Sequence, residues 1–433
     1  CEALICDWSH FELRQNWSTK LGLQEQAVNP YLLLSFDDDP TKQLLRSQTF
    51  FRKNFHREGR HILRDSKKKI RLGYFSANYY THPVMVLLCE MFEVYDKSKF
   101  EIYAYAYGPS FRDSYTQRVI NNVDLFRDIR DMDDLSASEI ARKDNLDIAI
   151  DLTGYTQYSR LSIFSFRVAP IQISYLGYPG TLGADCFDYL IADKVLIGKN
   201  DSKFYSEKII YMPDSYQCNQ SKRETKKNVF TRSQLSLPDN CFVFTCFNAN
   251  FKITPIEFDI WMRLLLQVDN SVLWLYRSNS ISMNNLLLEA EKRGVDSSRI
   301  IFAQMMPLSD HLSRHSHGDL FLDTFNYNAH TTASDALWSG LPVLTKLGRS
   351  FSSRVSASLL SALNMSELIT YSIQQYYEKA YWLAKNPSII HKYKILLKEA
   401  RKTSHLFDTL KFTKELESVY HNLLNHNSFN TNS

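Results

Sequence analysis

The pattern of apolar and polar positions predicts an α/β protein. Short apolar runs recur along the chain, and many are followed by segments whose apolar residues are spaced three and four apart. Nearly continuous apolar strands of this kind belong to parallel sheets that helices cover on both faces. We therefore expect repeated strand–helix units, arranged in two groups.

The first group of strands lies between residues 66 and 216. Its strands are expected at 67–78, 99–108, 146–154, 171–180, 187–193 and 207–213, with helices at 82–96 and 136–145. Ahead of this group, residues 1–65 form a helical lead-in, because the apolar residues of segments 7–21 and 37–55 have helical spacing.

The second group follows a polar, lysine-rich stretch, QCNQSKRETKKN at 217–228, which is the best linker candidate. Strands are expected at 241–248, 271–278, 299–305, 319–326 and 341–346, and helices at 254–268, 282–294, 308–316, 331–340 and 353–364. We expect two Rossmann-like, doubly wound lobes at 66–216 and 229–395 with a cleft between them, and C-terminal helices at 396–433 that pack back on the first lobe. A chain of 433 residues is too long for one core.

Composition and charge exclude several classes of protein. The net charge is only +4, from 51 basic and 47 acidic residues, which argues against a general nucleic-acid binder. The 7 Cys include no C-x-x-C, so we expect neither a disulfide framework nor a zinc knuckle, but free thiols in a reducing compartment, the cytoplasm. Apolar runs such as VMVLLC are too short to cross a membrane, and no signal peptide is visible.

The stretch NYNAHTTASDALWSG, residues 326–340, is the first candidate site. It follows an apolar strand and opens a helix with His330, Thr331 and Thr332. Two interpretations are open. Thr332 and Asp335 match a capping box, which would make this an ordinary helix start. Alternatively, the free amides and the positive helix end bind a phosphate, with the Thr hydroxyls and His330 beside it.

Two further turns follow strands of the same predicted sheet. Lys252 lies between the strand at 241–248 and the next helix, which would bring a cation near the proposed phosphate. His311 and Arg314 lie one turn apart on the helix at 308–316. A zinc site at His311, His315 and His317 is disfavoured, because only the first two can share a helical face and no carboxylate completes the set.

The first lobe carries two more candidate turns. Gly177, Gly180 and Gly183 form a tight turn after a strand, where glycine would let a ligand approach the backbone. His82 comes just before Pro83 at a helix start, and is either an acid/base or a helix-entry residue. The D-x-D patterns at 37–39 and 131–133 precede helices, so we expect capping there rather than metal binding.

These turns together resemble the catalytic region of the O-GlcNAc transferase family, including its bacterial, SPINDLY-like members. The resemblance is collinear over about residues 70–420. The segments that carry it include LGYFSANYYTHP, DLTGYT, APIQISYLGYPGTLGADCFDYLIAD, FNANFKITP, RIIFAQMMPLSDHLSRH, LFLDTFNYNAHTTASDALWSGLPVLT and LFDTLKFTKELESVY. The tetratricopeptide repeats usual upstream in this family are absent and the first residue is Cys, so we expect an N-terminal portion to be missing.

The resemblance implies a GT-B fold, a UDP-sugar donor bound to the C-terminal lobe, a protein or peptide acceptor, and inverting transfer without a metal or other cofactor. It also implies a role for each matching residue. Lys252 would contact the diphosphate, His330, Thr331 and Thr332 the phosphate and sugar, Asp335 the ribose, and His311 the uracil with Arg314 nearby; Gly180 and Thr181 would line the sugar site, and His82 would lie beside the reaction centre.

The sequence departs from the animal enzymes of this family at three positions. Ala249, Leu308 and Tyr327 stand where those enzymes have Gln, Lys and a small Cys. N-acetylglucosamine is the expected sugar, but Tyr327 leaves glucose or another hexose open, because a Tyr would crowd a pocket that Cys lines. Another acceptor and a non-catalytic UDP-sugar-binding scaffold are the remaining alternatives.

Overall fold

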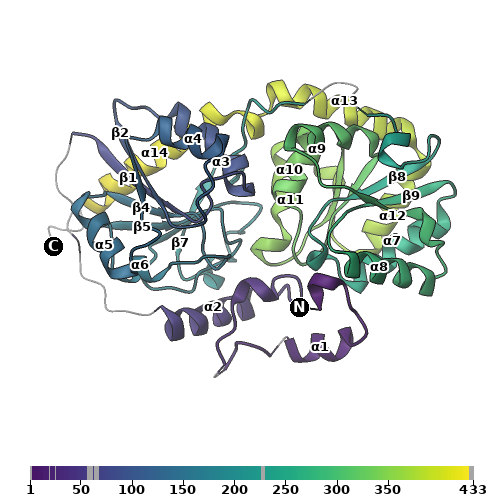
Figure 1. The fold of residues 1–433 in the computed structure, drawn as a ribbon, viewed down its shortest axis with the longest axis horizontal. Helices are drawn as coiled ribbons and strands as arrows, with labels where there is room; N and C mark the ends of the chain where they lie inside the picture. Colours follow the sequence, from purple (N-terminus) through teal and green to yellow (C-terminus); the bar gives the residue numbers. More distant parts are fainter. Residues whose placement is uncertain are drawn as a thin grey trace. The chain divides into compact units, whose positions relative to one another are not determined.

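The computed structural model describes residues 2–18, 20–24, 26–55, 62, 68–225 and 230–428 (Figure 1). The chain forms two compact units. The N lobe comprises Lys20–Leu32, Asp39–Ser221 and His405–Ser433, and the C lobe comprises Cys1–Thr19, Leu33–Asp38 and Lys222–Ser404. No helix in the described ranges has both the length and the apolar character needed to cross a bilayer.

The N lobe is built on a sheet of seven parallel strands in the order β3-β2-β1-β4-β5-β6-β7. The strands are β1 (Ile70–Ser76), β2 (Phe100–Ala106), β3 (Leu125–Asp128), β4 (Ile148–Asp151), β5 (Ile171–Ser174), β6 (Tyr189–Asp193) and β7 (Lys208–Met212). Every residue of β4 and β5 is buried, as expected for central strands covered on both faces.

Helices cover both faces of this sheet (Figure 1). One layer contains α3 (Pro83–Val94), α4 (Ser114–Asn122) and α14 (Thr409–Ser428), and α5 (Asp134–Lys143) and α6 (Ser162–Ser165) lie on the other face. The lobe also includes α2 (Pro40–Asn54), which Asp39 caps by accepting from the amides of Thr41 and Lys42.

The C lobe has six parallel strands in the order β10-β9-β8-β11-β12-β13. They are β8 (Phe242–Cys246), β9 (Ser271–Tyr276), β10 (Ile300–Ala303), β11 (Leu320–Leu322), β12 (Val343–Lys346) and β13 (Ile369–Thr370). Its helices are α1 (Phe11–Ser18), α7 (Pro255–Gln267), α8 (Ser280–Lys292), α9 (Leu308–Arg314), α10 (Thr331–Trp338), α11 (Val355–Ala362), α12 (Ile373–Lys385) and α13 (Pro387–Thr403). The strand order reverses at β8, which is the switch point where doubly wound sheets bind ligands.

The observed division of the chain differs in detail from the expected one. The expected lead-in, 1–65, is shared between the two lobes, and residues 56–61 and 63–65 lie outside the described part. The chain passes from one lobe to the other between Ser221 and Lys222, within the expected linker, whose residues 226–228 also lie outside that part. At the C-terminus, α13 belongs to the C lobe, and the return to the N lobe comes at His405 rather than at residue 396.

Four helices and strands were not predicted from the sequence: β3, α4, α6 and β13. The strand β3 lies at the sheet edge, and none of its four residues is buried. An edge strand of this kind has no apolar run in its sequence, because its side chains remain partly in solvent. The strand β13 spans only two residues, Ile369–Thr370, which is too short to leave a pattern.

Candidate functional site

The candidate site lies at the carboxyl ends of β8 and β11. Two loops emerge there from neighbouring strands and are joined by side chains. The amide of Asn248, just after β8, donates to the Thr324 hydroxyl after β11 at 2.8 Å, and Lys252 Nζ donates to the carbonyl of Asn328 at 2.8 Å. The fold thus brings together segments that are about 76 residues apart in the sequence.

Lys252 is the cation of this site. Its ammonium lies 3.7 Å from the centroid of the Tyr327 ring, in a cation–π contact. Burial lowers the pKa of Lys252 to about 7, and the nearby Asp323 carboxylate opposes that fall. Lys252 is therefore held between its two protonation states near neutral pH, and a bound anion would favour the charged one.

The helix α10 begins beside Lys252, and its first turn is not closed by a capping box. His330 occupies the N-cap position, and among the described residues its side chain makes no capping hydrogen bond. The first intrahelical bond runs from the Ser334 amide to the His330 carbonyl, so the amides of residues 331–333 come before it. The alternative in which Thr332 and Asp335 form an ordinary capping box is wrong.

The side chains of this turn are held by other elements. The Thr332 hydroxyl donates to Asn248 Oδ1 at 2.6 Å, and His330 Nε2 lies 3.2 Å from the Ser352 carbonyl. Because a carbonyl only accepts, His330 carries its proton on Nε2. Burial and the neighbouring Lys252 push the pKa of His330 well below its ordinary range, so the ring is neutral at pH 7. Thr331 is half-buried at the start of the helix.

Asp323 organises the loop after β11; from the sequence, only its position at the end of an apolar strand was evident. Its carboxylate accepts from the amide of Ala329 at 2.6 Å and from the hydroxyl of Thr345 at 2.7 Å. It also accepts from the Thr324 amide at 2.9 Å. Burial raises the pKa of Asp323, while these hydrogen bonds and Lys252 act in the opposite direction.

The helix α9 contributes His311 and Arg314, which contact each other. Arg314 Nη2 donates to His311 Nδ1 at 2.6 Å, and the guanidinium lies 4.7 Å from the ring of Phe247, directly after β8. Burial drives the pKa of His311 well below its ordinary value and lowers that of His315 to about 3. His315 Nδ1 donates to the His311 carbonyl at 2.7 Å.

Asp335 forms a buried ion pair with a residue that was not among the predicted site residues. Arg223, from the segment that enters the C lobe, donates to the Asp335 carboxylate, and both side chains are buried, 3% and 7% exposed. Burial raises the pKa of Asp335, and the guanidinium works against this rise. No local pattern could reveal the pair, because 112 residues separate its members.

His82 lies in the N lobe, where it caps helix α3. Its Nδ1 accepts from the Val84 amide at 3.2 Å, so the interpretation as a helix-entry residue is confirmed. Burial lowers the pKa of His82 to about 4. The ring is therefore neutral at pH 7 and carries its proton on Nε2, which has no hydrogen-bond partner within the described part of the chain.

Gly180 and Thr181 lie in a turn of the N lobe that is held by its own hydrogen bonds. The Thr181 hydroxyl donates to the buried Glu207 carboxylate at 2.6 Å, and the Leu182 amide donates to the other oxygen at 2.7 Å. Gly177 is required by packing, since a Cβ there would lie 2.1 Å from the Leu152 carbonyl. The space beside Gly177 is therefore taken by the backbone of Leu152, whereas the sequence had suggested that a ligand would lie there.

The two D-x-D segments cap helices, as expected. Asp39 caps α2 and Asp133 caps α5. Asp38 accepts from the Ser350 amide at 2.9 Å and from its hydroxyl at 2.6 Å, within the C lobe. Among the described residues, no group of three or more His, Cys, Asp and Glu is placed to hold a metal ion.

Comparison with known proteins gives consistent matches. The SEC protein of Arabidopsis thaliana, named as a probable UDP-N-acetylglucosamine–peptide N-acetylglucosaminyltransferase, is 33% identical over 83% of this chain and 37% of its own length. The Petunia hybrida protein SPINDLY, with the same descriptive name, is 28% identical over 83% of this chain and 39% of its own length. The chain therefore spans less than half of either relative.

A solved structure matches the fold. A point mutant of the Thermobaculum terrenum O-GlcNAc transferase superposes with a TM-score of 0.83 at 26% identity, covering 96% of this chain and 79% of that one. The family model described as "Glycosyl transferase family 41" matches residues 44–226 and 217–416. The two doubly wound lobes, the candidate site at the switch point of the C lobe and these matches lead to one conclusion: the chain belongs to glycosyl transferase family 41.

Proposed function

We propose that this chain transfers N-acetylglucosamine from UDP-N-acetylglucosamine to Ser or Thr hydroxyls of proteins, with inversion at the anomeric carbon. The observation that carries the proposal is the position of Lys252 beside the open first turn of α10, at the switch point of the C-lobe sheet. The names of the Arabidopsis and Petunia relatives support the donor and the peptide acceptor.

The chemistry needs a stabiliser for the departing diphosphate. As the bond between sugar and phosphate breaks, negative charge builds up on the UDP oxygens. The Lys252 ammonium, the amides of residues 331–333 and the positive end of α10 would stabilise that charge. The acceptor hydroxyl forms its bond to the anomeric carbon from the opposite face and loses its proton late.

His82 is a weak candidate for the base that takes this proton. Its Nδ1 is occupied by the Val84 amide, and its pKa is lowered to about 4, so a proton on Nε2 leaves it without a free lone pair. We propose instead that His82 donates Nε2–H to an oxygen at the reaction centre.

We propose further roles for the remaining candidate residues. His311, held by Arg314, would stack on the uracil, and the turn of Gly180 and Thr181 would border the sugar. Asp335 has a carboxylate oxygen taken by Arg223, so a ribose hydroxyl would share this carboxylate with the guanidinium.

A transfer assay tests the proposal. The protein is incubated with UDP-N-acetylglucosamine and a pool of Ser- and Thr-containing peptides, and mass spectrometry detects addition of one sugar. Lys252→Ala should lower kcat by about 10²–10³-fold with the thermal unfolding curve intact, as expected when one preorganised charge is lost. Undiminished turnover in the variant would refute the role of Lys252.

A different hexose donor is the second candidate, and Tyr327 favours it. The ring of this residue lies against both Lys252 and His330, with its centroid 5.0 Å from the His330 ring. A donor screen with UDP-N-acetylglucosamine and UDP-glucose separates the two candidates. If Tyr327 limits the space near the sugar, Tyr327→Cys should raise kcat/KM for the N-acetylated donor relative to UDP-glucose.

We also propose that transfer needs no metal ion, because Lys252 and the helix end occupy the role that Mg²⁺ or Mn²⁺ has in other transferases. Activity should persist in EDTA, and loss of activity that Mn²⁺ restores would overturn this. A reducing, cytoplasmic compartment fits the six free thiols of the described residues.

A further inference from the structure

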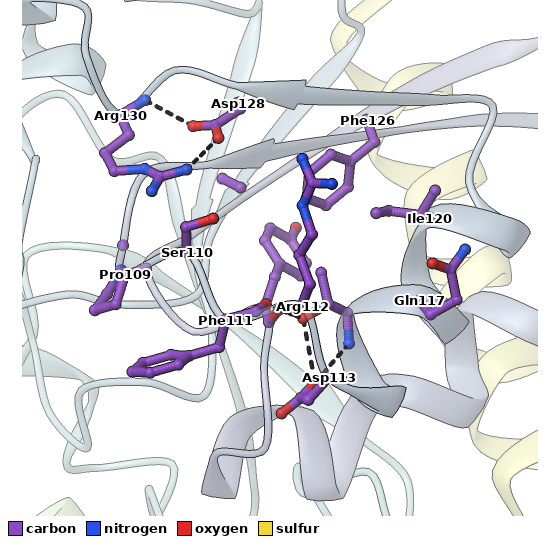
Figure 2. A pocket seen from close by; sticks show the side chains of 15 residues that line it. Pro109, Ser110, Phe111, Arg112, Asp113, Gln117, Ile120, Phe126, Asp128 and Arg130 are labelled. Carbon is purple, nitrogen blue, oxygen red and sulfur yellow. Dashed lines mark hydrogen bonds and ion pairs between the residues drawn. The ribbon is translucent and has the colours of Figure 1, made fainter.

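The N lobe contains a pocket that is lined by none of the residues assigned so far. It lies at the carboxyl ends of β1, β2 and β3, beside the start of α4, and has a volume of about 280 Å³ (Figure 2). Side chains of Ile120 and Phe126 give it apolar walls, and four charged residues also line it: Arg112, Asp113, Asp128 and Arg130.

Three of these four charges are already engaged within the lobe. Asp113 accepts from the Thr116 amide at 3.0 Å and from the Thr81 amide at 2.5 Å, and Asp128 forms an ion pair with Arg130. The guanidinium of Arg112 has no hydrogen-bond or ion-pair partner among the described residues. Figure 2 shows Arg112 reaching from the loop after Pro109 into the middle of the pocket.

An aromatic path joins this pocket to His82. Phe111, at the rim, is 53% exposed, and its ring centroid lies 4.8 Å from that of Tyr80. Tyr80 in turn lies 5.6 Å from the ring of His82. A chain that crosses this aromatic surface from His82 therefore reaches Arg112.

We propose that this pocket binds a glutamate or aspartate side chain of the acceptor polypeptide, with its carboxylate on Arg112. The proposal rests on the proposed function, since it requires a protein acceptor. A Glu side chain has an aliphatic stem for the walls at Ile120 and Phe126 and a carboxylate that matches the planar guanidinium. The site would make the enzyme prefer acceptors with an acidic residue at a fixed distance from the modified Ser or Thr.

Charge reversal tests the pocket. A set of fluorescent acceptor peptides carries one Glu or one Lys at each position in turn, and both binding anisotropy and transfer kinetics are measured with the full chain. At one or a few positions, wild-type protein should show a Kd and KM about tenfold lower for Glu than for Lys. Arg112→Glu should reverse this preference at the same positions.

Two controls isolate the effect. Lys97→Glu makes the same charge change at an exposed residue of the turn before β2, and should keep the wild-type preference. Hydrolysis of the UDP-sugar without peptide should stay within about twofold in Arg112→Glu, because the pocket that Arg112 lines includes none of the residues assigned to the donor.

The proposal is overturned if wild type does not distinguish Glu from Lys at any position, or if Arg112→Glu weakens both peptides equally. The binding arm separates it from the proposed function. Peptide binding that depends on Arg112, without sugar transfer, would refute the proposed transferase function and support the carboxylate site. Sugar transfer without any preference for Glu over Lys would support the transferase function and refute the carboxylate site.

Discussion

Lys252 combines two features that usually exclude each other, a buried environment and the positive charge that we propose for catalysis. The Asn328 carbonyl, the Tyr327 ring and the Asp323 carboxylate surround its ammonium, and burial still brings its pKa from 10.5 to about 7. A diphosphate would move this pKa back upward, since an opposite charge nearby favours the ionised form. Donor binding and protonation of Lys252 should therefore be coupled.

This coupling predicts proton uptake on binding of UDP. Above pH 7 the free protein holds Lys252 largely neutral, so UDP binding should take up close to one proton at pH 8, and affinity should fall as pH rises further. Below pH 7, Lys252 is already charged in the free protein, so UDP binding should cause no further proton uptake by this residue. Titration calorimetry in two buffers of different ionisation enthalpy measures this; Lys252→Met should abolish it, and equal heats in both buffers at pH 8 would contradict the prediction.

The buried pair of Arg223 and Asp335 predicts a second effect. Arg223→Met leaves Asp335 buried without its cation, which should destabilise the C lobe by about 3–5 kcal/mol and push the pKa of Asp335 higher. The affinity for UDP should then fall as the pH drops towards the raised pKa, while Arg223→Lys should recover much of both losses. Thermal melts and UDP binding between pH 5 and 8 test this, and a variant with unchanged melting would contradict it.

At the scale of elements, the start of α10 depends on a turn that the lead-in segment holds. Asp38 binds Ser350 and accepts from the Ser353 hydroxyl at 2.5 Å, and the enclosed Ser352 carbonyl accepts from His330. A residue far upstream thus helps fix the histidine beside the proposed diphosphate.

Neighbouring aspartates provide a matched test of that dependence. Asp38→Ala should raise the KM for the UDP-sugar several-fold, because the turn that orients His330 loses its acceptor. Asp39→Ala removes the cap of α2 in the N lobe and should cost about 1 kcal/mol of stability without changing that KM. Equal KM values for the two variants would show that the turn is held without Asp38.

At the scale of the whole molecule, the last helix completes the lobe that the first strands begin. In α14, Leu416 and Tyr420 are fully buried, and the Tyr420 hydroxyl lies 3.0 Å from that of Tyr74 in β1. Residues 70–94 and 405–428 are far apart in the sequence, but they share one core, formed by α14, α3 and β1.

Loss of this helix packing should affect one lobe more than the other. Leu416→Ala should cost about 2–5 kcal/mol, the usual range for a buried leucine, and hydrogen exchange should quicken in β1 and α3 before β8 and α10. Mass spectrometry of exchange at the level of peptides measures the order. Equal acceleration in both lobes would show that they unfold as one unit.

The sequence by itself determined the two parallel sheets and the position of each candidate turn. Buried central strands are mostly apolar, as in the sequences IAID of β4 and IQIS of β5, so these and most C-lobe strands appear as apolar runs. Parallel connection places the turns at one sheet edge. Lys252 and His330 could be placed near each other on that basis. Edge strands such as β3 could not be predicted from the sequence, because strands of half-exposed residues contain no apolar run.

Only the tertiary structure decided which groups are paired and which are free. Arg223 pairs with Asp335, which is 112 residues away in the sequence, and Asp38 accepts a hydrogen bond from Ser350, which is 312 residues away. The Thr181 hydroxyl donates to Glu207. His82 has its Nδ1 closed by the helix that it caps. Hydrogen bonds and burial of side chains depend on the packing of distant segments, and no local pattern of apolar and polar residues records that packing.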